Sequence, residues 1–463
     1  MEFRAVNLQD HPAQMSEPAP KPVLSLFDVI AATAGIVIGA GLFRLPSAVA
    51  ADAGSEAWFL GFWLAGGLVS LIGALCYAEL STAFPSTGGE YHFLTGAFGS
   101  RVGFLFAWAR VTVAQTGNIV LLAFVFGDYL ATAAPLGAYG PSIYAALSVA
   151  AVTLLNAAGL RLTAAVQRWL FVATMAGLGA LFMTGLSIDT VPAVAAAVPG
   201  APGLAAVGSA MVLVLFTYGG WNEAAYVSAE VRDGARNMSR ALIASIAVIT
   251  TCYVAVNWTY VTVLGLDGVA ASTAVASDVM RRGIGDTAAA FMTALVLVVV
   301  LKSMNVATLT GARTAYALGR DTPALGFFGR WNAERNAPTR ALALQLAMAL
   351  AFIGFGSLSR SGIETTIDYL SPVFWLFFLL TGLSLFVLRA KFPRAERPYR
   401  VPLYPLTPLV FCVSCAFMLY ASIDFAGSGA LVGLGVLVLG VPVMMLARAR
   451  PLKTTARGQD RSD

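Results

Sequence analysis

Two glycine-containing runs are the parts of this sequence whose residue types and spacing can support binding chemistry. GIVIGAGLFRLP places Gly39 and Gly41 two residues apart, and FTYGGWNE places Gly219 next to Gly220. Glycine costs a helix about 1 kcal/mol relative to alanine, so these runs favour local unwinding. An unwound turn offers N–H groups to a carboxylate and carbonyl groups to an ammonium ion, and an α-amino acid carries both. The alternative is that these glycines only allow close helix packing.

Several ionisable residues fall within apolar segments, where a charge is costly and therefore points to function. Glu223 follows the second glycine pair by about one turn. It can carry a coupling proton, or it can form a fixed ion pair with Arg110 or Arg44. Glu79 lies near the end of its apolar segment, where we expect a structural pairing with a neighbouring arginine.

Other chemistries find little support in the sequence. The histidines are His11 and His92, and the chain contains no H-E-x-x-H motif and no Walker-type phosphate loop. All four cysteines lie within apolar segments, where we expect free, buried thiols: Cys76, Cys252, Cys412 and Cys415. The sequence therefore predicts no metal, no cofactor, no enzymatic activity and no ATP-driven transport. A channel and a nutrient receptor that does not transport stay open as alternatives to a carrier.

Long apolar segments must position these residues. The 463 residues are 58% hydrophobic and 11% charged, with a mean hydropathy of +0.77, whereas about a quarter of the residues in soluble proteins are charged. The segments approach the roughly 20 residues that a helix needs to cross a bilayer, and helices satisfy their own backbone hydrogen bonds in lipid. The sequence predicts an all-α integral membrane protein with twelve spans: 24–48, 57–83, 97–130, 142–159, 164–187, 205–230, 238–264, 286–319, 339–356, 363–389, 404–424 and 428–449.

The two glycine runs fall in the first and sixth spans, which open two halves of a five-plus-five arrangement. The predicted organisation is a disordered cytoplasmic tail, two five-helix repeats, a pair of further helices and a second cytoplasmic tail: 1–23, 24–187, 205–389, 404–449 and 450–463.

The basic residues predict the orientation, because short cytoplasmic loops are enriched in lysine and arginine. With the N-terminus inside, only Arg281, Arg282 and Arg360 fall in outer loops, while most of the others fall in inner segments. The net charge of +5 therefore reflects topology. We expect a multi-pass protein of the inner or plasma membrane, surrounded by lipid, with both termini cytoplasmic and no nucleic-acid partner.

The sequence resembles the amino acid–polyamine–organocation (APC) superfamily over roughly residues 24–449. GAGLF resembles that family's interrupted first span, and YAELSTAFPSTGGEYHFLTGAFG (77–99) resembles the end of the second span with the segment that follows. YGGWNEAAYVSAEVRDGARNMSRALI (218–243) resembles the sixth span with its loop, and GARTAYALGRD (311–321) resembles the end of the eighth. The resemblance is nearest to the L-type amino acid transporter subgroup.

The resemblance implies a leucine-transporter-like fold in which the first ten helices form an inverted repeat and helices 1 and 6 are broken at the membrane midplane. It implies secondary-active transport of amino acids or related amines by alternating access, through a site formed by spans 1, 3, 6, 8 and 10. A polyamine or amine exchanger of the same fold is the alternative.

Residue by residue, the resemblance implies a substrate site at the two breaks. Phe216 falls where family members place an aromatic residue that closes over the substrate, with ordinary packing as the alternative. Asn118 matches a third-span position that contacts substrate in some members. The full set of matched positions is Gly39, Ala40, Gly41, Asn118, Phe216, Tyr218, Gly219 and Gly220.

Further charged residues gain roles from the resemblance. Arg168 falls where some members keep a fifth-span lysine, and Lys302 lies where sodium-coupled relatives hold sodium. Fixed cations there would repel the ion, so we expect sodium-independent transport that is proton-coupled or an exchange. By analogy with neurotransmitter transporters, Arg44 and Asp368 form an outer gate. The alternative is that Arg44 extends to the headgroups and Asp368 caps its helix.

Overall fold

The structure is a computed structural model. It describes residues 25–85, 89–158, 160–187, 201–322, 325–332, 335, 337–357, 362–427 and 429–448. Some side chains inside these helices lie outside the description, among them those of Arg168 and Asp368. Regular structure in the described ranges is helical, apart from one isolated β-bridge between Asn332 and Ala337.

The helices follow the predicted spans closely, and short helices are added between them. In chain order they are α1 (Leu26–Val37), α2 (Gly41–Ala53), α3 (Glu56–Ala83), α4 (Gly89–Phe98), α5 (Ser100–Ala109), η1 (Arg110–Gln115), α6 (Thr116–Ala133), α7 (Gly140–Ala158), α8 (Leu160–Ser187), α9 (Leu204–Tyr218), η2 (Trp221–Glu230), α10 (Gly234–Ala271), α11 (Val275–Gly283), α12 (Asp286–Asp321), α13 (Thr339–Ser357), α14 (Gly362–Lys391), α15 (Leu406–Ala426) and α16 (Gly429–Arg448).

Within the described residues, nine helical stretches are long and apolar enough to cross a membrane: Glu56–Ala83, Ser100–Ala131, Gly140–Ala158, Leu204–Ala225, Arg236–Ala271, Asp286–Tyr316, Thr339–Ser357, Leu370–Lys391 and Leu406–Ala426. Shorter apolar helices cover Val172–Ser187 and Gly429–Met445. The predicted all-α, multi-pass architecture is confirmed. The count of twelve spans stays a prediction, since the other three predicted spans fall on the broken α1–α2 pair, α8 and α16.

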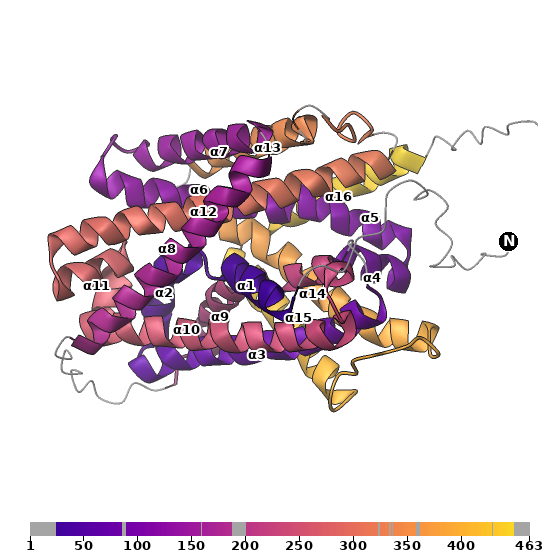
Figure 1. Cartoon of the computed structure of the whole chain (residues 1–463), viewed down its shortest axis with the longest axis horizontal. Helices are drawn as coiled ribbons and strands as arrows, with labels where there is room; N and C mark the ends of the chain where they lie inside the picture. Colours follow the sequence, from indigo (N-terminus) through magenta and orange to yellow (C-terminus); the bar gives the residue numbers. More distant parts are fainter. Residues whose placement is uncertain are drawn as a thin grey trace, which may run out of the picture.

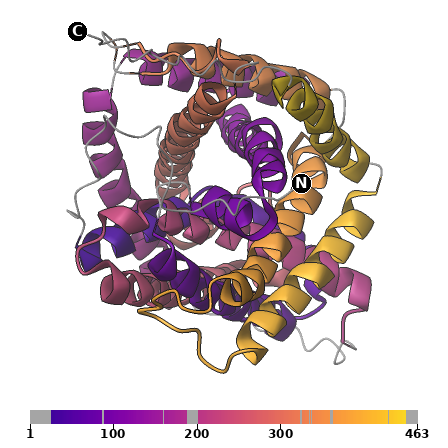
Figure 2. The same cartoon turned by 90° about the vertical axis from the view of Figure 1, so that its right-hand side faces the viewer.

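The long helices α3, α6, α10 and α12 run along the long axis of the molecule, and α8 crosses them obliquely (Figure 1). The α5–η1–α6 stretch lies inside the bundle, where the end view shows it in purple among the other helices (Figure 2). Its most apolar window is 83% buried, the highest value of the nine stretches. This third span therefore has the position from which it can line a central site.

Both predicted interruptions are confirmed. The first lies between the end of α1 at Val37 and the start of α2 at Gly41. The second follows the end of α9 at Tyr218, where Gly219 and Gly220 are non-helical and the chain continues as the 3₁₀ segment η2.

At one end of α3, Glu79 is buried and paired with arginine, which confirms the sequence expectation. Arg389 of α14 donates to its two carboxylate oxygens at 2.7 and 2.5 Å, and the Val401 backbone N–H donates at 2.7 Å. Arg397 lies 3.4 Å from the same group. These contacts join the end of α3 to α14 and to the loop before α15. The four cysteines are free, as predicted; Cys76, Cys412 and Cys415 are also buried, whereas Cys252 is only partly buried.

Candidate functional site

A cavity of about 200 Å³ lies where the two interrupted helices meet. It is smaller than the roughly 300–1,000 Å³ of sites for drug-sized ligands, so it suits a small solute. Much of its wall is apolar and includes the rings of Phe106, Phe216, Phe374, Phe377 and Phe378. The predicted residues that line it are Gly39, Ala40, Gly41, Arg44, Asn118, Phe216, Gly219, Gly220 and Glu223.

The two breaks lie against each other at this cavity. A Cβ atom added to Gly41 would lie 3.1 Å from Thr217 Cγ2 in α9, and one added to Gly220 would lie 2.9 Å from Ile36 Cγ2 in α1. Gly220 also has φ +109°, a conformation that glycine adopts without strain and other residues rarely adopt. The close approach of the two helices therefore depends on the missing side chains.

A π-helical turn, η1, shapes the wall that the third span contributes. The hydroxyl of Thr116 donates to the Val111 carbonyl five positions earlier, at 2.8 Å. Such wide turns are frequent at functional sites. The turn begins at Arg110 and ends at Gln115, and both of these residues line the cavity. The Gln115 amide donates to the hydroxyl of Thr310 in α12 at 2.8 Å, which joins the third span to the eighth.

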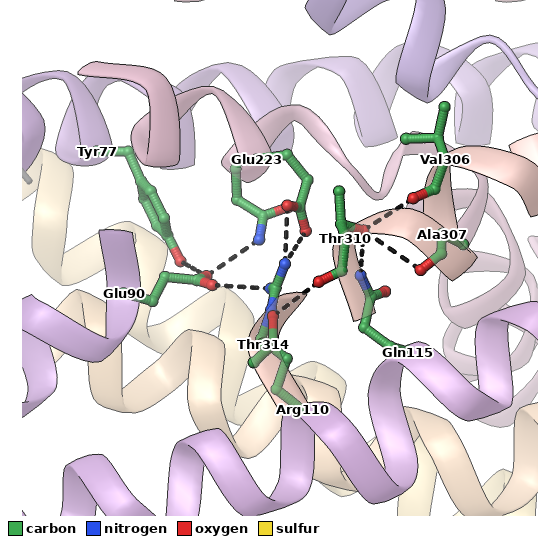
Figure 3. Close-up of polar contacts among 10 residues, drawn as sticks. Tyr77, Glu90, Arg110, Gln115, Glu223, Val306, Ala307, Thr310 and Thr314 are labelled. Atoms are coloured by element: carbon green, nitrogen blue, oxygen red, sulfur yellow. Dashed lines mark hydrogen bonds and ion pairs between the residues drawn. The ribbon is translucent and has the colours of Figure 1, made fainter. Parts of the chain in front are cut away.

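A charged cluster forms part of the cavity wall, with Arg110 between two glutamates (Figure 3). Arg110 Nη2 lies 2.8 Å from each carboxylate oxygen of Glu223, and its Nη1 lies 3.7 Å from Oε2 of Glu90. The Glu90 Oε1 atom accepts hydrogen bonds from the Tyr77 hydroxyl at 2.5 Å and from the Asn222 amide at 3.1 Å. The cluster therefore joins α3, α4, η1 and η2.

The two carboxylates of this cluster differ in access. The Glu223 side chain is 22% exposed, against 4% for Glu90 and 9% for Arg110. Removing one member of a buried ion pair leaves its partner uncompensated, at a cost of about 3–5 kcal/mol. The structure contains the ion pair between Glu223 and Arg110, which is one of the two roles considered for Glu223. No group of three or more histidine, cysteine, aspartate or glutamate side chains in the described ranges is arranged to hold a metal ion.

Comparison with known families decides what kind of protein carries this cavity. A family model described as amino acid permease matches residues 24–445, nearly the whole chain. The chain belongs to the amino acid permease family. This membership confirms the APC resemblance, and it makes the protein a permease rather than a membrane-embedded enzyme.

The permease is also similar to animal amino acid transporters. It is 28% identical to the b(0,+)-type amino acid transporter 1 of Mus musculus over 421 residues, which cover 89% of this chain and 85% of that relative. It is 29% identical to the large neutral amino acids transporter small subunit 2 of the same species over 439 residues, or 92% of this chain and 81% of the relative. The Homo sapiens form of the latter is 28% identical over 439 residues, with the same coverage. These similarities agree with the predicted nearness to the L-type subgroup.

Two of the predicted residues of the permease are fully buried away from the cavity lining. The Tyr218 hydroxyl donates to the Trp63 carbonyl at 2.9 Å, so its side chain braces α9 against α3. Lys302 is buried within α12, and the next residue, Ser303, does line the cavity.

Of the two residues of the predicted outer gate, only Arg44 has a side chain among the described residues. Arg44 lines the cavity and its Nε atom lies 4.0 Å from a carboxylate oxygen of Asp128 in α6. The side chain of Asp368 lies outside the described residues, as does that of Arg168, so their proposed roles stay predictions.

Sequence reasoning missed three cavity residues of this permease. Arg110 was considered only as a partner for Glu223, and Glu90 stood inside the GGEY motif without a role. Gln115 was not considered at all. For Arg110 and Gln115 the available signal was a charged and an amide side chain inside the apolar third span, where each demands a partner.

Proposed function

We propose that this permease moves amino acids or closely related amines across the membrane by alternating access, as a secondary-active transporter. The observation that carries the proposal is that two interrupted helices meet at one small cavity. The start of α2 at Gly41 presents N–H groups that suit a carboxylate, whereas the carbonyl ends of α1 and α9 suit an ammonium group. The names of the relatives, all amino acid transporters, support this substrate class.

We also propose the finer architecture expected from the sequence. It comprises twelve spans, an inverted repeat of 24–187 and 205–389, two further helices in 404–449, and cytoplasmic termini in the cell membrane. The coincidence of every predicted span with a described helix supports the count. The scarcity of basic residues in the predicted outer loops supports the orientation.

Sodium should not be required for transport. Lys302 is fully buried in α12 beside the cavity-lining Ser303, and a fixed cation there would repel sodium. Uptake of radiolabelled amino acids by proteoliposomes should exceed that of protein-free liposomes and stay unchanged when choline replaces sodium at constant pH. A lack of uptake for every amino acid and amine tried would contradict transport itself. A steep dependence of uptake on sodium would contradict only the proposed role of Lys302 as a fixed cation that repels sodium.

The ion pair with Arg110 favours a structural role for Glu223 over a proton-carrying role. Glu223→Gln should therefore lower uptake by the same factor at every pH, roughly tenfold or more, because charge-assisted hydrogen bonds contribute about 1.5–3 kcal/mol. Uptake rates of the variant and the wild type from pH 5 to pH 8 provide the measurement. A variant whose rate no longer depends on pH, beside a wild type whose rate does, would show that Glu223 carries the coupling proton.

A further inference from the structure

The side-chain amide of Gln115 is held in one orientation at the end of the π turn. Thr310 of α12 donates its hydroxyl hydrogen to the Val306 carbonyl at 3.0 Å, with the Ala307 carbonyl at 3.4 Å. Because a hydroxyl carries one hydrogen, Thr310 can only accept from any further partner. The Gln115 atom that lies 2.8 Å from it is therefore the amide nitrogen, which donates. Figure 3 shows this nitrogen turned toward Thr310 and the amide oxygen turned away from it.

The amide oxygen of Gln115 is an acceptor with a fixed direction. No described residue donates to it, and Gln115 is 8% exposed and lines the cavity. The side chain is packed against α12, since a Cβ atom added to Gly311 would lie 3.2 Å from the Gln115 Cβ atom. An acceptor left unpaired at a buried site costs about 1–3 kcal/mol. The oxygen therefore favours a solute that brings a donor into the cavity.

Two other uncharged polar side chains of the cavity wall are less selective. Asn118 lies three residues further along the third span and has no hydrogen bond among the described residues, so it can turn either its NH2 group or its oxygen toward a ligand. The Ser303 hydroxyl lies against the first break, since a Cβ atom added to Gly39 would lie 3.1 Å from its oxygen. Both groups can serve donors as well as acceptors, whereas Gln115 can only accept.

We propose that Gln115 is a specificity-determining residue, whose fixed amide oxygen favours amino acids with a hydrogen-bond donor on the side chain over amino acids with a hydrocarbon side chain of the same shape. The inference rests on the proposed function. The carboxylate and ammonium groups are common to all amino acids and are assigned to the helix breaks, so selection depends on the wall that meets the side chain. Much of that wall is made of phenylalanine rings, and a substrate that leaves the one fixed acceptor unpaired is penalised.

The test measures how strongly paired amino acids inhibit the counterflow of a labelled substrate in proteoliposomes. Threonine is compared with valine, glutamine with methionine and tyrosine with phenylalanine, which place a donor at different distances from the α-carbon. In the wild type, the donor-bearing member of at least one pair should bind about three- to tenfold more tightly, as expected for one hydrogen bond. Gln115→Leu removes the acceptor and should bring this ratio to about one.

Two further variants separate the orientation of the amide from its packing. Thr310→Val keeps the shape of the side chain but removes the acceptor that fixes Gln115, so the amide can turn and the ratio should fall. Gln345→Leu in α13 is the matched control. Gln345 is buried, does not line the cavity and packs on the same glycine, since a Cβ atom on Gly311 would clash with its Nε2 atom. This variant should keep the wild-type ratio.

A wild-type ratio near one for every pair, an unchanged ratio in Gln115→Leu, or an equal loss in Gln345→Leu would overturn the specificity role while leaving the proposed function intact. If Gln115→Leu does not fold, an unchanged ratio in Thr310→Val would overturn it. Failure of both variants to fold, with Gln345→Leu intact, would make the hydrogen bond between Gln115 and Thr310 structural and would also overturn the role. If the wild type exchanges no amino acid or amine, the proposed function fails and this inference fails with it.

Discussion

Gly220→Val should abolish amino acid uptake while leaving the protein in the membrane. A Cβ atom at this position would lie 2.9 Å from Ile36 Cγ2, and φ is +109°, so a β-branched side chain meets both a steric clash and backbone strain. The expected displacement separates η2 from α1 at the cavity wall. We expect uptake to fall by about a hundredfold or more, since misplacement of about 1 Å at a reacting site can cost that much. The measurement is initial uptake rate per amount of protein in the membrane.

Gly61→Val is the matched control for that loss. Gly61 lies in α3, where an added Cβ atom has no neighbour within 4 Å, so the same substitution should leave uptake nearly unchanged. The same logic applies to Gly41→Val, whose side chain would press on Thr217. Normal uptake by Gly220→Val would contradict the assignment of the two helix breaks as the substrate site.

Reversing the charge of Arg44 should also cripple transport. Arg44 follows the first break by three residues, lines the cavity and lies 4.0 Å from Asp128. Arg44→Asp would place a carboxylate in the cavity wall beside the partly exposed Asp128. Breaking a fully buried ion pair costs about 3–5 kcal/mol, and this partly exposed pair should cost less. We expect initial uptake rates to fall by no more than roughly a hundredfold, because solvent reaches both side chains and reduces the free-energy cost of losing the pair.

Two double variants identify the partner of Arg44. The outer-gate proposal expects Arg44→Asp with Asp368→Arg to recover part of the uptake. Arg44→Asp with Asp128→Arg should recover thermal stability, because it rebuilds the contact seen here, but less of the transport. Recovery of transport by the Asp128 swap alone would contradict Asp368 as gate partner. Additive losses in both double variants would mean that Arg44 pairs with neither residue during transport.

The spans and the two breaks were predictable for a physical reason. Bilayer thickness sets the length of an apolar helix, so the ends of α3 and α7 fall within two residues of those expected from hydropathy. Glycines at positions such as Gly41 and Gly220 lower the cost of unwinding. Their occurrence in both the first and the sixth span indicated where the two helices break, whereas the Gly66–Gly67 pair lies inside the unbroken α3.

The walls of the cavity were less predictable, because they depend on turns and contacts that composition does not record. The π turn from Arg110 to Gln115 has no residue signature, yet it decides which side chains of the third span line the cavity. Tyr253 stood in the sequence as one aromatic residue among many in apolar helices. Its hydrogen bonds to the ends of α1 and α9 become apparent only in the folded structure.

Counterflow exchange tests the central claim most directly. Purified protein is reconstituted into liposomes loaded with an unlabelled amino acid, and the entry of the same amino acid in labelled form is followed over time. A carrier that works by alternating access should show a transient accumulation of label above its external concentration, and Gly220→Val should abolish this accumulation while Gly61→Val keeps it. Label that only equilibrates would indicate a channel, and label that never enters, for any amino acid or amine tried, would indicate a protein that binds without transporting; either result would contradict the account.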